Sequence, residues 1–436
     1  MKKILILMLV VFSLVGCTNV ATTEEPEREY TAEERLLLSE MEASFWFFYE
    51  QANQDVDSPG YGLINDRFPT NPNLSSIASV GFGLAGIIVG VEYEWITYEE
   101  GFERVDKTLD TFTEMDHFHG FYYHFVDKQT AKRAGNSEVS IIDTALFLAG
   151  AIAAGEYFGG SIKEKAHALY ERIDWTWYLD KQRNMFYMGY YPGTGFAGHW
   201  DFYGEQLILY VLGAGAPKSE HRTSKVVYDS FIRRRTSYGG GETFISSWFG
   251  SLFTYQFSHA FVDFRHTQDQ QGVNWFQNSV DATIANRQYA IDMSSTFQTF
   301  SATSWGMTAS DGPSGYSGYY GSKPSGYTDD AHRNDGTIPP AGALGSVVFT
   351  PDLVKRAIVN FESIGGLKGK YGYKDAYNFD RPSIWIAQDY IGIDKGITLL
   401  MIANYFDETI WEYFMKNPYV LQGLERIGIE KISETS

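Results

Sequence analysis

Two long segments of this chain are apolar on every side of a helix, and this feature restricts its fold more than any other. Residues 76–92 and 140–156 contain few charged side chains, so each helix needs other elements all around it. The intervening segment 97–115 is instead amphipathic, with Phe102, Leu109 and other apolar residues on one face. The pattern predicts an all-α fold in which apolar inner helices are paired with amphipathic outer ones.

The same helical spacing recurs along the rest of the chain. We expect helices at residues 33–51, 76–92, 97–115, 140–156, 161–173, 201–213, 274–293, 350–361 and 397–415. Gly- and aromatic-rich loops such as 189–199 and 311–326 lie between them, and 184–191 is strand-like. Helix pairs that close into a ring would bring these loops to one mouth. We favour this double-helix toroid over a superhelical solenoid, and periodicity alone does not separate the two.

Composition excludes several classes of function. The chain has 436 residues, with 54 acidic and 35 basic side chains and a net charge of −19. This acidic balance argues against nucleic-acid binding, which needs a basic face. A single cysteine rules out an internal disulfide and a cysteine-based metal site. Aromatic residues make up 16% of the chain, enough to serve both the core and stacking platforms for sugars.

The N-terminus has the layout of a secretory signal. Lys2 and Lys3 precede an apolar run over residues 4–11, and the segment ends in Leu-Val-Gly before Cys17. This ending resembles a bacterial lipobox; the alternative is an ordinary signal peptide with a chance cysteine. We therefore expect an exported lipoprotein, lipidated at Cys17 and attached to a bacterial membrane through that anchor only. The predicted parts are a signal peptide (1–17), an acidic tether (18–30), a single domain (31–430) and a tail (431–436).

Two carboxylates lie at the start of the second apolar segment. Glu138 and Asp143 fall in the tract from Asn136 to Leu146, where partial burial would raise a carboxyl pKa as a general acid requires. A structural interpretation competes, because Ser140 and Asp143 have the spacing of a helix cap and Glu138 suits the helix dipole.

A third carboxylate, Glu205, leads into the apolar run that follows it. Trp200 and Tyr203 lie nearby, and an aromatic platform beside a carboxylate is what a sugar site needs. The competing interpretation is again a carboxylate that only stabilises a helix start.

A further tract offers Asp375, Asp389 and Asp394 in loops that precede the last apolar helix, although Asp394 could equally be a helix cap. The histidines lack the spacing of metal ligands, so no metal or other cofactor is expected. Neither a serine-nucleophile motif nor a nucleotide-binding glycine motif is present.

Several separated motifs, taken in order, resemble the bacterial glucoamylase-like family. They are Asp66-Arg67, residues 76–83, residues 137–146, Trp248-Phe-Gly-Ser-Leu-Phe, the tract Trp305-Gly-Met-Thr-Ala-Ser-Asp-Gly-Pro-Ser-Gly-Tyr, Asp335-Gly-Thr-Ile-Pro-Pro and Ile391-Gly-Ile-Asp-Lys-Gly. The resemblance extends from about residue 40 to about residue 428. One departure is Ala403, where this family is expected to have glutamate before Asn-Tyr.

The resemblance implies an (α/α)6 barrel that hydrolyses β-1,2-linked glucan with inversion at the anomeric carbon, either within the chain or by release of sophorose from its end. It places the acids Glu138, Asp143, Glu205 and Asp394 in the pocket. Six further residues are implied to contact sugar: Arg67, Trp200, Tyr203, Trp305, Asp375 and Asn378. As a hypothesis, Glu205 and Glu138 are the acid–base pair in undecided order, and Asp143 and Asp394 position groups or relay water.

Other functions remain in competition with this one. A glycan-binding lipoprotein without activity would use the same aromatic groove, and a hydrolase could act on another glucan linkage. A polysaccharide lyase with a similar toroid is disfavoured, because the acidic chain would repel an anionic substrate. The expected partner is a neutral glucan and the expected oligomeric state is a monomer.

Overall fold

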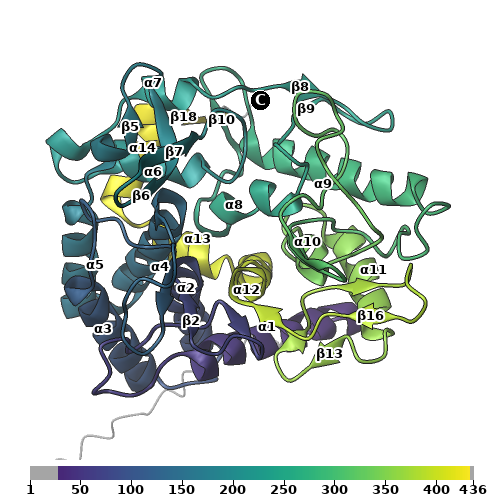
Figure 1. The fold of residues 1–436 in the computed structure, drawn as a ribbon, viewed down its shortest axis with the longest axis horizontal. Coiled ribbons are helices and arrows are strands. Elements are labelled where there is room, and N and C mark those ends of the chain that lie inside the picture. The colour runs from purple at the N-terminus through teal and green to yellow at the C-terminus, as the bar shows by residue number, and fades with distance from the viewer. Residues whose placement is uncertain (1–27, 433–436) are drawn as a thin grey trace, which may run out of the picture.

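The computed structural model describes residues 28–432 of the chain. The predicted signal segment 1–17 with Cys17, and the tether as far as residue 27, lie outside the described residues. Within the described part the structure is helix-rich (Figure 1). The α-helices are α1 (Ala32–Gln51), α2 (Ile77–Glu92), α3 (Tyr98–Glu114), α4 (Ile141–Phe158), α5 (Gly160–Arg172), α6 (Leu207–Gly215), α7 (Lys225–Asp229), α8 (Phe257–Phe261), α9 (Trp275–Asp292), α10 (Pro340–Leu344), α11 (Pro351–Glu362), α12 (Gly392–Asp407), α13 (Thr409–Phe414) and α14 (Pro418–Ile427).

The strands are short and lie in the connections between helices. All of their pairings are antiparallel, and β6 with β7 forms the longest hairpin among the described residues. The strands are β1 (Arg67–Phe68), β2 (Leu74–Ser76), β3 (Phe125–Asp127), β4 (Val139–Ser140), β5 (Leu179–Asp180), β6 (Met185–Tyr191), β7 (Gly195–His199), β8 (Arg235–Thr236), β9 (Phe244–Ile245), β10 (Thr267–Asp269), β11 (Ser310–Gly312), β12 (Gly315–Ser317), β13 (Lys368–Gly369), β14 (Gly372–Tyr373), β15 (Tyr377–Asn378), β16 (Trp385–Ile386), β17 (Tyr390–Ile391) and β18 (Ile429–Lys431).

Apolar helices occupy the middle of the molecule and amphipathic helices surround them. The central helix α2 packs against α4 and α12, and α4 packs in turn against α6. Around them, α3 and α5 lie on one side and α9 and α11 on the opposite side (Figure 1). This is the arrangement expected from the alternation of apolar and amphipathic segments, because a helix that is apolar all round is stable only when other elements shield it from water.

Glycines allow the two most apolar helices to approach closely. A Cβ added at Gly150 in α4 would lie 1.9 Å from the carbonyl oxygen of Gly81 in α2, so neither position accepts a larger residue without moving a backbone. An aromatic contact then joins this inner layer to the outer one: the rings of Phe112 in α3 and Phe147 in α4 stack with centroids 3.7 Å apart. Such a pair adds about 1 kcal/mol beyond the area it buries.

Most expected helices begin and end within two residues of the predicted bounds, but two differ. The helix expected from residue 201 begins only at Leu207, because the preceding residues run through turns, and Glu205 is therefore left before the helix. The last apolar helix begins at Gly392, earlier than residue 397, so Asp394 lies in its first turn and is not a cap. Glu408, with φ of 56°, separates α12 from α13.

One described helix, Ile141–Phe158 (α4), is long and apolar enough to cross a membrane by length and composition. It is 83% buried inside the structure. Its partners are α2, α5 and α6, so its apolar surface is covered by protein as in a core helix.

Candidate active site

Short backbone bridges tie together the starts of three apolar helices. Arg67 in β1 pairs with Ile391, the N-cap residue of α12. The N–H of Ile77, the first residue of α2, donates to the carbonyl of His124 at 3.1 Å. His124 in turn donates its N–H to the carbonyl of Glu138, just before α4, at 2.9 Å. The side chains that flank these three helix starts are therefore held at one end of the molecule.

His124 lies between two of the predicted carboxylates. Its Nδ1 is 2.9 Å from Oε1 of Glu138, and its Nε2 is 3.4 Å from Oδ1 of Asp143. Burial opposes protonation of the imidazole, but the charge of Asp143 and the hydrogen bond with Glu138 outweigh it and raise the pKa of His124 to about 9. At neutral pH the site therefore holds an imidazolium between two carboxyl groups.

The same contacts have opposite consequences for these two acids. Burial raises the pKa of Asp143, which also accepts a hydrogen bond from the Ser140 hydroxyl at 2.5 Å. Burial acts on Glu138 in the same sense, but the hydrogen bond and charge of His124 win and lower its pKa. Glu138 is therefore ionised at neutral pH.

Glu205 lies in the turn before α6, and no other described residue hydrogen-bonds its carboxyl group. Burial raises the pKa of Glu205 to about 7, opposed by its own backbone N–H and reinforced by the charge of Asp143. The helix α6 packs against α4, whose first turn carries Asp143, so the charge of Asp143 acts on Glu205 across the two helix starts. A carboxyl group that is half protonated near neutral pH, and whose proton no neighbouring residue holds in a hydrogen bond, is suited to general acid catalysis.

Asp375 and Asp394 form a buried carboxyl pair. Burial raises the pKa of Asp375, and the charge of Asp394 raises it further. Asp375 accepts a hydrogen bond from the Asp311 N–H at 2.6 Å. One oxygen of each carboxyl, Oδ1 of Asp375 and Oδ2 of Asp394, has no partner within the described part of the chain. Two like charges this close cannot both ionise at neutral pH, so the pair retains a proton.

A buried ion pair lies beside these two acids. The ammonium group of Lys395 is 2.5 Å from Oε1 of Glu40, and both side chains are almost completely buried. Glu40, Lys395, Asp375 and Asp394 line one small cavity. Burial raises the pKa of Asp394, and the ammonium of Lys395 acts against that rise.

Arg67 is surrounded by three carboxylates. Its Nη1 lies 3.0 Å from Asp311 and 3.3 Å from Asp389, and its Nε lies 3.5 Å from Asp66. Asp389 also accepts a hydrogen bond from the Thr70 N–H at 2.8 Å. The guanidinium group therefore holds β1, the β11 hairpin and the loop before α12 together, and it neutralises part of the negative charge there.

Tyr316 extends from the β11–β12 hairpin toward the same acids. The residue is 49% exposed, and burial together with the charges of Asp394 and Asp375 raises the pKa of its hydroxyl well above the usual value. The guanidinium of Arg67 lies 5.9 Å from the centre of this ring.

The structure joins Glu138 and Asp143 through His124, pairs Asp375 with Asp394 and links Asp375 to Arg67 through Asp311. The other predicted sugar contacts are not brought to this site. Tyr203 and Trp305 have no exposed surface and Trp200 is almost fully buried. The ring of Tyr203 stacks on Trp275 at 5.0 Å. Asn378 is buried, and its amide is engaged by Thr337 and Asp335 in a neighbouring loop. In this structure none of these four presents a face to a ligand.

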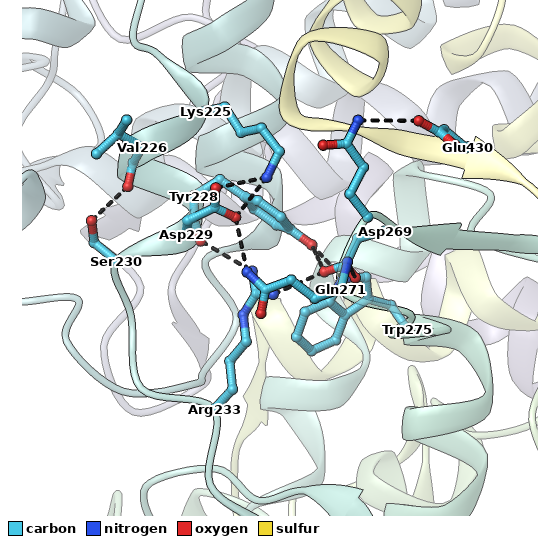
Figure 2. A network of polar contacts seen from close by, with 11 residues as sticks. Lys225, Val226, Tyr228, Asp229, Ser230, Arg233, Asp269, Gln271, Trp275 and Glu430 are labelled. Carbon is cyan, nitrogen blue, oxygen red and sulfur yellow. Dashed lines mark hydrogen bonds and ion pairs between the residues drawn. The ribbon is translucent and has the colours of Figure 1, made fainter.

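Figure 2 shows a polar network that includes Trp275, the residue on whose ring Tyr203 stacks. Asp269 accepts hydrogen bonds from the Tyr228 hydroxyl at 2.6 Å and from Arg233 at 2.9 Å. The indole N–H of Trp275 donates to the same hydroxyl at 2.8 Å. The network fixes the ring on which Tyr203 stacks, so Tyr203 is part of the buried packing two residues before Glu205.

Sequence reasoning missed several members of the site. The sequence analysis excludes His124, with the other histidines, as a metal ligand and gives it no other role. Asp66, Asp311 and Tyr316 lie within family-like motifs but are not among the predicted site residues. These residues reach the site because segments far apart in the sequence pair with each other, as Arg67 does with Asp311. Residue spacing along the chain does not predict such pairing. Within residues 28–432 no group of three potential ligands could hold a metal ion.

Comparison with known proteins identifies the family to which this chain belongs. Residues 198–418 match the family model described as Glycoamylase. An exo-β-1,2-glucooligosaccharide sophorohydrolase (non-reducing end) from Parabacteroides distasonis is 27% identical over 91% of this chain. The chain spans only 58% of the length of that curated relative.

Two solved structures have a similar fold. An endo-β-1,2-glucanase from Chitinophaga pinensis, in complex with sophorotriose and glucose, has a TM-score of 0.82 at 25% identity, over 92% of this chain and 99% of that one. A β-1,2-glucanase from Parabacteroides distasonis has a TM-score of 0.81 at 25% identity, over 92% of this chain and 60% of that one.

Proposed function

Because the chain belongs to the glycoamylase family, which its match over residues 198–418 establishes, we propose that it is a glycoside hydrolase acting on β-1,2-linked glucan. Relatives named for that linkage cover nine-tenths of the chain, which supports the substrate. The observation that carries the proposal is the placement of Asp143, Glu205 and Asp394 at the starts of three apolar helices, where burial raises the pKa of Glu205 to about 7.

Glu205 is proposed as the general acid that protonates the leaving glycosidic oxygen. Its raised pKa keeps a proton available, and no other described residue competes for that proton. Glu138 is proposed as the general base that activates water on the opposite face of the sugar. Its lowered pKa keeps it ionised, and its side chain is 25% exposed and so open to water.

Asp394 is the alternative base, and the structure favours it less. Its side chain is nearly buried and shares a proton with Asp375, so it is a weaker acceptor at neutral pH. Asp143 and Asp394 are proposed as positioning groups, the first through His124 and the second through Asp375. Inversion would follow from a water between base and sugar, which needs the two carboxyls about 6.5–9.5 Å apart.

The deciding experiment is a product analysis on linear β-1,2-glucan. We expect new reducing ends, with sophorose alone if the enzyme acts from a chain end and mixed oligomers if it cuts within the chain. NMR of the first products should show inversion of the anomeric configuration. Binding without new reducing ends would instead support a glycan-capture protein, and hydrolysis of only another glucan would exclude the β-1,2 linkage.

We also propose that the helices close into an (α/α)6 barrel. The even-numbered helices from α2 to α12 are inner and the odd-numbered ones outer, in six successive pairs. Contacts of α2 with α4 and α12, of α4 with α6 and of α12 with α10 join inner helices that would be neighbours in such a ring, which supports the proposal. Asp143, Glu205 and Asp394 lie at the N-terminal ends of α4, α6 and α12, where the helix dipoles favour negative charge.

Export and lipid attachment at Cys17 are proposals that rest on sequence alone. The test is a Cys17→Ser variant of the full chain: labelled fatty acid should enter the unmutated protein and not the variant, and the variant should leave the membrane fraction. Equal labelling of both would contradict the proposal. A single domain that remains monomeric is likewise proposed, and light scattering would test it.

A further inference from the structure

Exposed tyrosines are concentrated in one short segment of the chain. Among residues 28–432, five tyrosines are classed as exposed: Tyr98, Tyr191, Tyr316, Tyr319 and Tyr327. Tyr316, Tyr319 and Tyr327 are 49%, 47% and 51% exposed, and they lie within twelve consecutive positions after the β11 strand. Surface tyrosines of a soluble protein are usually scattered singly, so such a group calls for a function.

Tyr327 lies on the Glu205 side of the site. Its ring contacts those of Phe202 and Trp248, with centroids 4.9 Å and 5.3 Å away. Phe202 is three residues before Glu205, and the N–H of Trp248 donates to the carbonyl of Tyr203 at 3.3 Å. The exposed ring of Tyr327 is therefore continuous with the turn that carries Glu205.

Tyr316 lies on the other side, where the guanidinium of Arg67, which pairs with Asp311 and Asp389, is 5.9 Å from the centre of its ring. Tyr319 comes between them in sequence. Its ring contacts Phe249 at 4.7 Å between centroids, and the guanidinium of Arg333 lies 5.1 Å from its centre. Each of the three rings has a supporting group on one side and solvent on another.

The segment that carries Tyr319 and Tyr327 is fixed by buried polar contacts. The Ser325 side chain is fully buried and accepts hydrogen bonds from the N–H groups of Ala331 and His332. Arg234 donates to the carbonyl of Gly326 at 2.7 Å. Rings held in this way lose little entropy when a ligand binds.

We propose that Tyr316, Tyr319 and Tyr327 form an aromatic rim that binds successive glucosyl units of a neutral glucan chain on either side of the carboxylates. The inference rests on the proposed function and adds the residues that hold the chain beyond the reacting bond. A flat exposed ring matches the apolar face of a pyranose, and the acidic surroundings disfavour an anionic polymer. The rim replaces Trp200, Tyr203 and Trp305, which the sequence suggested and the core encloses.

The test is binding in a Glu205→Gln background, in which bound glucan is not consumed. Retardation in gels containing β-1,2-, β-1,3-, β-1,4- or α-1,4-glucan gives the dissociation constant. The variants Tyr319→Ala and Tyr327→Ala should each bind about threefold to tenfold more weakly to the glucan that retards the protein. The corresponding phenylalanine variants, which keep the flat face, should change the dissociation constant less than twofold. Tyr98→Ala is the matched control, because Tyr98 is 45% exposed on α3 and lies outside this segment.

Each outcome decides the proposal. Unchanged dissociation constants in both alanine variants would overturn the rim, and so would an equal loss of affinity in the Tyr98→Ala control. The rim would also be overturned if none of the four glucans slowed migration of the protein. If the Glu205→Gln variant does not fold, the same ring substitutions are made in the chain that retains Glu205, and their effect is measured as a change in KM for the glucan. Failure of the proposed function is distinguishable: the unmutated chain would then release no reducing ends from β-1,2-glucan, whichever glucan the rim binds.

Discussion

The imidazole Nδ1 of His124 lies 2.9 Å from a carboxylate oxygen of Glu138. A cation thus holds the carboxylate proposed as base, and it lowers the pKa of that carboxylate while its own is raised to about 9. The two shifts have the same origin, since each partner favours the charged form of the other.

Replacing His124 with asparagine should move the acidic limb of the pH–rate profile to higher pH. Without the imidazolium, the pKa of Glu138 rises, so a larger fraction of Glu138 is protonated at a given acidic pH and cannot act as the base. We expect a shift of about one pH unit in kcat/KM, measured on β-1,2-glucan between pH 4 and 8. An unmoved acidic limb would exclude Glu138 as the base and direct attention to Asp394.

The same histidine should make stability depend on pH. The pKa of His124 in the folded protein, about 9, exceeds the ordinary value of 6.5, so the folded state binds the proton more tightly. Its stabilisation is complete below pH 6.5 and is lost as the pH rises to about 9, on the order of 2 kcal/mol. Urea unfolding at pH 6 and pH 9 should show this loss in the unmutated chain, and a smaller one in the His124→Asn variant.

Glu205→Gln should reduce kcat by about 10²- to 10⁴-fold, because glutamine cannot donate a proton to the leaving oxygen. In the unmutated enzyme, kcat/KM should fall above about pH 7, where Glu205 loses its proton, and this limb should be absent from the variant. Circular dichroism serves as the control for folding. Near-normal turnover by the glutamine variant would remove Glu205 from the mechanism.

That variant should also be more stable at high pH. Because the folded pKa of Glu205, about 7, is above its ordinary 4.5, the folded state favours the neutral form and loses stability as the pH rises between these values. Above pH 7 the penalty is on the order of 3 kcal/mol, and glutamine does not incur it. Unfolding free energies at pH 8 should therefore favour the variant, and those at pH 4 should be similar.

The order of helices could be predicted from sequence because the buried side of a helix requires apolar residues at regular spacing. The all-round apolar segments became α2 and α4, and the capping interpretation of Asp143 was also correct: its N–H donates to the Ser140 hydroxyl at 3.2 Å. That cap and a place in the candidate site are compatible, since the start of an inner helix is also where the acids meet.

The sugar-contact residues could not be predicted in the same way. An aromatic residue next to a carboxylate gives the same local sequence whether its ring faces a cleft or the core. Trp200 and Tyr203 flank Glu205 in sequence, yet both are buried, whereas Tyr327 reaches that turn from more than a hundred residues away through Phe202. Such contacts depend on how long loops return over the helix ends, and no periodicity encodes this.

Substitution of Arg67 should destabilise the candidate pocket strongly. Replacing it with methionine leaves Asp66, Asp311 and Asp389 without their shared cation, and removal of one member of a largely buried charge cluster costs about 3 kcal/mol. Urea unfolding measures this loss. Lys107→Ala is the matched control, because the pair of Lys107 and Glu103 on α3 is exposed and should contribute less than about 0.5 kcal/mol. Adding Asp389→Asn to the Arg67→Met variant should recover part of the stability, since one unpaired charge is then removed; a further loss of similar size would instead show that Arg67 and Asp389 contribute independently.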